Sequence, residues 1–393
     1  MERQISDLLQ RIEALEESTA ATNLMVVDVY YGLLMLVSLF AVFGFWRLGT
    51  DTKQFQRNFA VSVVIAGGFA WAIGWFLYWT VPHGTIYPGP NEISGIEFSS
   101  EFAGVPFRGE PVVTQSIFLP FLALSLIGIS LAIGPLAERA NGLIAPIFAA
   151  VFGGVLFPVS MGWAWHSDSW IVYFFGYSDF AAIGPAILMP CSIAIGASAI
   201  LPRQNNQDRG SGEAGHWAVL IGLVAMVLIA VNAGGELWSW DSGFSSVFGR
   251  GFGFSDFVLG MIAALGAGIL VAALWARDAS QWAVAMICAL IGVAVGLDIY
   301  SAFASFAVGL IAALAGLKLY QRVNVQNLPV TLFGVAVFAL ITCGIFEALI
   351  HTSTDGLATV LGQVIGTVLM IAIGSGAGLV TGGIARLVDR FMP

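Results

Sequence analysis

Eleven long apolar stretches take up most of this chain of 393 residues. Each holds roughly the 20 apolar residues that an α-helix needs to cross a lipid bilayer. We place them at 24–46, 57–81, 115–135, 142–163, 180–201, 217–237, 254–275, 281–297, 300–320, 329–350 and 357–385. Hydrophobic residues make up 58% of the chain and charged residues 10%, a balance typical of a polytopic all-α membrane protein. The remaining loops are too short for a soluble catalytic domain, so we do not expect an enzyme.

Lysine and arginine are distributed unevenly over the loops. If the N-terminus lies outside, the inner loops and the C-terminus hold eleven of them and the outer side holds four. The positive-inside rule then predicts a multi-pass cell-membrane protein with an extracellular N-terminus and a cytoplasmic C-terminus. No basic patch indicates a nucleic-acid partner. The three cysteines lie within spans and lack zinc-ligand spacing, so we expect neither a metal site nor another cofactor.

The first 20 residues are polar and separate from the membrane domain, which we place at 21–390. Ile5, Leu8, Ile12 and Leu15 recur at spacings of three and four residues, which is the apolar stripe of a short amphipathic helix. Segment 1–20 is therefore either an extracellular coiled coil that joins copies of the protein or a single helix resting on a surface.

Seven short motifs occur along the spans in a fixed order. They are Phe43-Gly44-Phe45-Trp46-Arg47; Leu136-Ala137-Glu138-Arg139; Pro158 with Trp163 and Trp165; Asp179-Phe180-Ala181; Asn232-Ala233-Gly234; the small-residue run 312–317 with Lys318; and Phe333-Gly334-Val335 with Cys343-Gly344-Ile345-Phe346. Each motif alone is weak. Together, in this order and over almost the whole chain, they resemble the ammonium transporter (Amt/Rh) family.

That resemblance implies a homotrimer of eleven-helix subunits, each with a narrow central pore that carries ammonium or ammonia across the lipid bilayer. In the family a tryptophan face binds ammonium at the outer mouth, and an indole ring is a sound cation site. Trp163 or Trp165 takes this role here, unless both belong to an interfacial aromatic belt. Asp179 matches the residue that orders the outer site by bonding backbone N–H groups, and a carboxylate is favoured at a helix start on structural grounds too.

The pore positions depart from the family pattern. Two stacked phenylalanines normally close the pore mouth, and the matching positions here are Leu124 and Val231 (just before Asn232). Two histidines normally line the pore. Counting from Asp179 puts Ile187 at the first position, and two counts give either Leu332 or Ala336 at the second. No histidine lies within any predicted span.

An aliphatic lining has direct consequences for transport. It offers no group that replaces the hydration of an ammonium ion, whose uncompensated burial is costly. We therefore expect a channel of this family with an altered, apolar pore. The alternatives are a non-conducting structural or sensory trimer and a channel for another small neutral solute, such as carbon dioxide or water.

Other polar residues and glycines within the spans carry further expectations. Ser125 and Ser192 are predicted to bond their own helix backbone, and Asn232 to join neighbouring helices or line the pore. Asp298, Glu347 and Gln363 lie near predicted outer ends, where water can reach them. Glycines 374, 376, 378 and 382 predict close helix packing in the last span.

Overall fold

The computed structural model describes residues 29, 32–70, 112–140, 142–165, 170–202, 212–238, 254–323, 328–350 and 356–391. The predicted N-terminal helix (1–20) and the long loop after the second span lie outside these residues. Within the described ranges the regular structure is helical, without strands. For a few residues in these ranges, among them 230–238, only the backbone is described.

Every predicted span coincides with one helix or with two or three continuous helices in the part of the chain that the structure describes. In order these are Gly32–Leu48; α2 (Lys53–Ala60) with η1 (Val61–Gly67); α4 (Val112–Arg139); α5 (Ile144–Val151), η3 (Phe152–Leu156) and α6 (Phe157–Trp165); η4 (Gly184–Leu188) with α8 (Met189–Ile200); α9 (Glu213–Trp238); α10 (Phe254–Trp275); α11 (Ala279–Ala294); α12 (Ala302–Arg322); α13 (Leu328–Ile350); and α14 (Gly356–Phe391). A short helix, α7 (Trp170–Phe175), precedes η4. The prediction of an all-α bundle with eleven spans is confirmed.

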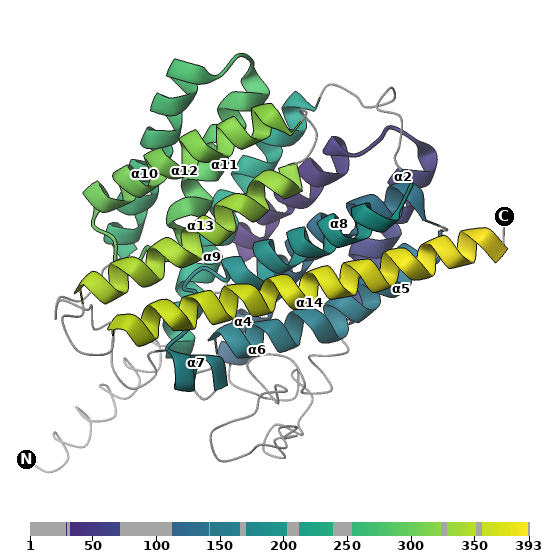
Figure 1. Cartoon of the computed structure of the whole chain (residues 1–393), viewed down its shortest axis with the longest axis horizontal. Coiled ribbons are helices and arrows are strands. Elements are labelled where there is room, and N and C mark those ends of the chain that lie inside the picture. The colour runs from purple at the N-terminus through teal and green to yellow at the C-terminus, as the bar shows by residue number, and fades with distance from the viewer. Residues whose placement is uncertain are drawn as a thin grey trace, which may run out of the picture.

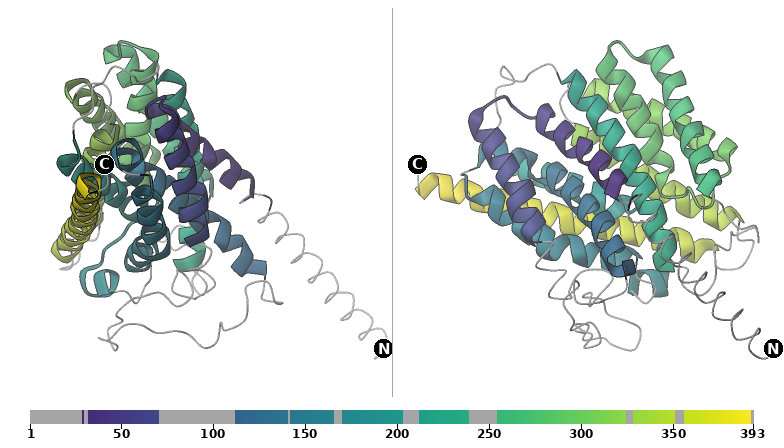
Figure 2. Two further views of the ribbon diagram at one scale, coloured as in Figure 1. Left: turned by 90° about the vertical axis from the view of Figure 1, so that its right-hand side faces the viewer. Right: turned by 180° about the vertical axis from the view of Figure 1, so that it is seen from behind.

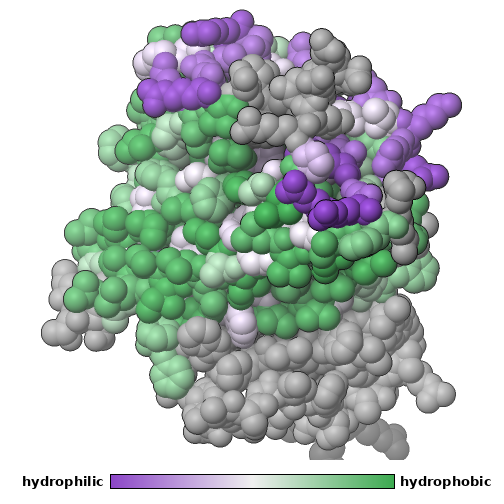
Figure 3. Space-filling model, turned by 45° about the vertical axis from the view of Figure 1, so that its right-hand side comes forward, coloured by the Kyte–Doolittle hydropathy of each residue, from purple (hydrophilic) through white to green (hydrophobic). Residues whose placement is uncertain are grey.

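Six of these helices within the described residues are long and apolar enough to cross a membrane. Successive spans run in opposite directions, so the connections between them lie at two opposite ends of the bundle (Figures 1 and 2). We name these the Arg139 end, where α4 stops and α13 starts, and the Asp179 end, where η4 starts and α13 stops. Hydrophobic side chains form a broad band over the face in Figure 3, as expected for contact with lipid.

Side-chain caps explain where several helices start. The Thr52 hydroxyl accepts a hydrogen bond from the Phe55 amide at 3.2 Å, and the Asp278 carboxylate accepts one from the Gln281 amide at 2.9 Å. Ser301 plays the same part for α12. Such caps satisfy amide groups that have no partner within the first helical turn.

Three segments, η1, η3 and η4, are π-helical turns inside longer helices. A π-turn accommodates one extra residue and is found frequently at functional sites. The one at η4 contains Ile187, a predicted pore residue.

The last helix packs closely along α8, and Figure 1 shows its C-terminal end projecting beyond the bundle. A Cβ atom on Gly374 would lie 2.5 Å from the Met189 carbonyl oxygen, and one on Gly382 would lie 3.2 Å from that of Ala197. Gly378 also faces the α8 backbone. These three confirm the predicted close approach. The expectation for Gly376 is wrong, because a Cβ atom there would meet nothing within 4 Å.

The helix of the sixth predicted span starts earlier than predicted and includes a histidine. Helix α9 begins at Glu213, four residues before the predicted start of its span, so His216 lies in the first turn of an apolar helix. His216 is buried. His216 therefore belongs to the helix that carries the sixth predicted span, one residue before that span begins.

Candidate functional site

Asp179 forms the cap of the helix that carries Ile187. One carboxylate oxygen accepts a hydrogen bond from the Ile183 amide at 2.8 Å, and the other accepts one from the Gly184 amide at 2.6 Å. The Tyr177 hydroxyl also donates to the second oxygen, at 3.4 Å. Asp179 is completely buried. The predicted arrangement, a carboxylate that bonds backbone, is confirmed.

The turn around this cap leaves little space. A Cβ atom on Gly184 would lie 2.6 Å from the Tyr177 hydroxyl oxygen and 2.9 Å from an Asp179 carboxylate oxygen. Ala182 adopts a φ of 55°, a conformation that costs a residue with a side chain roughly 1–2 kcal/mol. The hydrogen bonds of the cap therefore hold a strained turn that fixes the start of η4 and α8.

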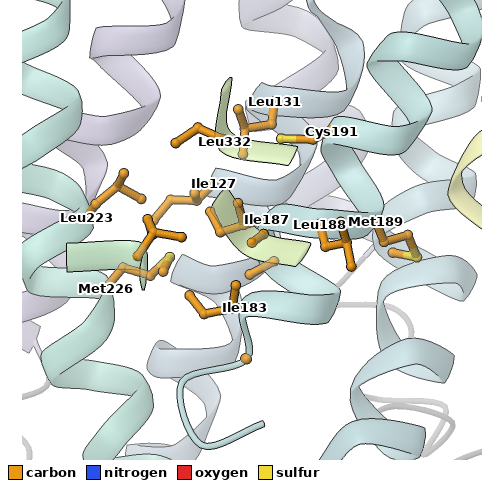
Figure 4. Packing of buried hydrophobic residues seen from close by; sticks show 14 of the residues in the cluster. Ile127, Leu131, Ile183, Ile187, Leu188, Met189, Cys191, Leu223, Met226 and Leu332 are labelled. Atoms are coloured by element: carbon orange, nitrogen blue, oxygen red, sulfur yellow. The ribbon is translucent and has the colours of Figure 1, made fainter. Parts of the chain in front are cut away.

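The predicted pore positions with described side chains lie in the core of the bundle. Leu124, Ile187, Leu332 and Ala336 are all fully buried. In Figure 4 the side chains of Ile127 and Leu131 (α4), Ile187 (η4) and Leu332 (α13) come together between their helices. We name these four residues the aliphatic column. Ala336 follows Leu332 by one turn of α13 and belongs to the same buried cluster.

A cavity of about 170 Å³ lies at the Arg139 end of this column. Leu131 belongs to both, because it lines the cavity and lies beside Leu332 in Figure 4. The cavity is also lined by polar side chains from α4 and α8, namely Ser130, Glu138, Arg139 and Ser198. A mostly apolar cavity that also contains four polar side chains thus adjoins the aliphatic column.

The remaining site predictions fall on different parts of the molecule. Trp163 is half-buried and packs against the core near the end of α6. Trp165 ends the same helix, and Val231 and Asn232 lie on the last turns of α9, where the structure describes the backbone alone. The roles predicted for these three side chains therefore stay predictions.

Three expectations about polar residues need correction. Ser192 donates to the Leu188 carbonyl at 2.8 Å, as predicted, whereas the Ser125 hydroxyl is buried with no hydrogen-bond partner. Gln363 is fully buried, and its amide group donates to the Ser178 carbonyl at 2.6 Å. Asp298 and Glu347 each have a buried carboxylate oxygen. Folding of the chain around the outer helix ends therefore shields groups that the sequence alone placed within reach of water.

Sequence reasoning missed one polar contact at the Arg139 end. The Tyr320 hydroxyl lies 3.0 Å from Nε2 of His216, and Nδ1 of His216 lies 2.7 Å from the Gly212 carbonyl oxygen. The two rings meet edge to face with centroids 5.8 Å apart. His216 and Tyr320 lie 104 positions apart in the chain, and their contact joins α9 to α12. Neither residue belongs to a recognisable motif.

Comparison with protein-family models and with curated proteins gives no match. Solved structures do match. A structure titled "Sensor Amt Protein" is similar with a TM-score of 0.68 and 14% identity, covering 94% of this chain and 95% of its own. The Rh50 protein of Nitrosomonas europaea has a TM-score of 0.63 and 14% identity, with 93% and 89% covered. Mep2 of Candida albicans has a TM-score of 0.61 and 16% identity, with 93% and 84% covered.

These likenesses extend over nearly all of the chain. At such low identity the agreement concerns how the helices are arranged and connected. The chain therefore has the fold of the ammonium transporter (Amt) and Rh channel structures.

Proposed function

We propose that the protein is a multi-pass membrane channel of the ammonium transporter type, whose apolar pore passes neutral ammonia and excludes ammonium ions. The shared fold supports a channel of this kind. The observation that carries the altered selectivity is the aliphatic column, in which the side chains of Ile127, Leu131, Ile187 and Leu332 come together.

The energetics favour the neutral species. Moving an unpaired ion into a medium of low polarity costs tens of kcal/mol in the idealised limit, whereas a small neutral polar group costs a few kcal/mol. The column has no side chain that replaces the water around an ammonium ion, and none that relays a proton. Ammonia that leaves its proton outside faces a far lower barrier.

The proposed path runs between the two ends of the bundle. The charge distribution over the loops puts the Arg139 end in the cytoplasm and the Asp179 end outside. The cavity lined by Ser130, Glu138 and Ser198 is then the inner chamber. At the outer end, Trp163 or Trp165 supplies an aromatic face for an arriving cation. Asp179 orders the backbone there instead of contacting the solute, because both its oxygens are occupied.

We also propose a homotrimer, with segment 1–20 as an extracellular helix that helps to join the subunits. Large hydrophobic side chains on α14 are exposed in the single chain, among them Leu357, Leu361, Val368 and Val380. Lipid or neighbouring subunits cover such surfaces in a membrane. Native mass spectrometry of the full-length protein in detergent tests the assembly, and a monomer would contradict it.

One observation favours a second candidate, a non-conducting structural or sensory protein of the same fold. Ile187 and Leu332 are fully buried, so no passage of water size reaches their side chains in this conformation. If the column never opens, the bundle is sealed and any response to a ligand must be conformational.

Reconstituted full-length protein distinguishes these functions. We expect stopped-flow measurements to show faster internal alkalinisation after an ammonium pulse than in empty liposomes, without an ammonium-dependent current. Ile187→Ala removes bulk from the column and should speed alkalinisation further. Ile221→Ala, at an exposed position on α9, is the matched control and should leave the rate unchanged.

The opposite results are equally clear. A saturable ammonium current would contradict exclusion of the ion. Folded protein whose permeability equals that of empty liposomes, for wild type and Ile187→Ala alike, would contradict conduction and support the second candidate. Parallel measurements of carbon dioxide and water permeability test the third possibility, a channel for another neutral solute.

A further inference from the structure

The turn between α11 and α12 packs against the last turns of α13 at the Asp179 end. The Cys343 thiol donates to the Val295 carbonyl oxygen at 3.9 Å. The Tyr300 ring meets the Phe346 ring edge to face, with centroids 4.9 Å apart. A Cβ atom on Gly296 would lie 2.6 Å from the Tyr300 ring, so the ring also packs closely over its own turn. These contacts fix the turn relative to α13.

Three polar atoms in this packed region have no hydrogen-bond partner. They are a carboxylate oxygen of Asp298, a carboxylate oxygen of Glu347 and the hydroxyl oxygen of Tyr300, and each is buried. Tyr300 as a whole is only 2% exposed. The Asp298 carboxylate acts electrostatically on Glu347, and both carboxylates act on the Tyr300 hydroxyl. The three groups therefore lie within range of one another's charge.

The Asp298 and Glu347 carboxylates lack a nearby positive charge from the described part of the chain that would stabilise them. Among the residues that the structure describes, no lysine, arginine or histidine forms an ion pair with either carboxylate. Two like charges at close range repel each other, and an uncompensated charge in a poorly solvated position is costly. Asp298 and Glu347 each have one buried carboxylate oxygen, but both residues keep part of their surface exposed.

We propose that Asp298, Glu347 and Tyr300 form a binding site for a small monovalent cation. Carboxylate and phenol oxygens accept the hydrogen bonds of an ammonium ion and also coordinate alkali ions. A bound cation would satisfy all three unpartnered oxygens and separate the two negative charges. A divalent ion is a poorer fit, because calcium takes six to eight oxygen ligands and the described residues offer no group of three or more metal-binding side chains.

The site goes beyond the proposed function, because a cation can bind here whether or not the column conducts. It is also separate from the Asp179 cap, in which both carboxylate oxygens already accept backbone hydrogen bonds. The site draws its two carboxylates from different elements, the turn before α12 and the end of α13. Occupancy would therefore tie these two elements together.

Isothermal titration calorimetry of the full-length protein in detergent tests the site. Ammonium, sodium and potassium chloride are titrated in separate arms, at constant ionic strength set by choline chloride. We expect saturable binding of at least one of the three ions. Glu347→Gln and Asp298→Asn should each weaken it by about tenfold or more, because a charged ligand is lost. Tyr300→Phe should weaken it less, by roughly two- to fivefold.

Two controls separate loss of the site from loss of the fold. Glu213→Gln removes an exposed carboxylate at the Arg139 end and should bind like wild type. The Glu347→Gln variant should unfold at a temperature no lower than wild type, because one of two repelling charges is gone. No saturable binding of any monovalent ion, unchanged binding in both carboxylate variants, or stronger binding of calcium than of all three would each overturn the proposal. The ammonia permeability of wild type is measured independently.

Discussion

Replacing Asp179 with alanine should destabilise the protein strongly and slow transport with it. The substitution removes the acceptors of the Ile183 and Gly184 amides, at 2.8 and 2.6 Å, in a site without solvent. A hydrogen bond to a charged group contributes about 1.5–3 kcal/mol. The loss of two gives roughly 3–6 kcal/mol in the free energy of unfolding. The weaker contact from Tyr177, at 3.4 Å, is left out of this sum.

Reversible unfolding in mixed detergent micelles measures this change. Asp179→Asn keeps one oxygen acceptor, so we expect about half of the alanine effect. Glu213→Ala removes a carboxylate that is also in the first turn of a helix but exposed, and it should change stability by less than about 0.5 kcal/mol. A loss below about 1.5 kcal/mol for Asp179→Ala would refute the reasoning, because it is less than one charged hydrogen bond.

Three further predictions concern other residues. Gly184→Ala should cost about 1–3 kcal/mol of unfolding free energy, because the added methyl group would lie 2.6 Å from the Tyr177 hydroxyl oxygen. Tyr320→Phe should cost about 0.5–1.5 kcal/mol, since it removes the contact of 3.0 Å with His216. Burial raises the pKa of Asp298 from 3.8 to about 7, although nearby backbone amides lower it. Between pH 3.8 and about pH 7, Asp298 therefore keeps its proton in the folded protein but loses it in the unfolded chain. The free energy of unfolding should consequently fall as the pH rises through this range.

Each of these has a measurement that decides it. Gly376→Ala, where a Cβ atom meets nothing within 4 Å, is the control for Gly184→Ala in the same unfolding assay, and equal effects of the two would contradict the steric argument. If Tyr320→Phe unfolds at the same denaturant concentration as wild type, the contact with His216 contributes nothing to stability. Asp298→Asn should flatten the fall in stability with pH, and an unchanged slope would exclude Asp298 as its source.

The sequence predicted the fold well because lipid imposes strong rules. Long apolar stretches marked the spans, and the motif around Asp179 indicated a capped helix start, which the hydrogen bonds to Ile183 and Gly184 confirm. The boundary near His216 was misplaced, because a histidine that bonds Tyr320 and Gly212 can remain inside a helix. Hydropathy alone does not reveal such partners.

The candidate site was harder to predict, because it depends on which side chains meet. The unpartnered oxygens of Asp298, Tyr300 and Glu347 come together only when the turn after α11 packs against α13. The spacing of Asp298, Tyr300 and Glu347 along the chain matches no recognisable motif. Likewise, two counts along the tenth span gave Leu332 or Ala336, and both are buried on the same helix. Register counting cannot separate two positions that share one face.

The π-helical turn that contains Ile187 has a consequence for how this protein can change over evolutionary time. A π-turn accommodates one extra residue, so deleting one residue from 184–188 would return the segment to regular winding and leave the flanking segments facing nearly as they do now. Within the turn itself, a different side chain would then take the place of Ile187 in the apolar lining. Insertions and deletions of a single residue at this turn are therefore a route by which such proteins could exchange one lumen chemistry for another.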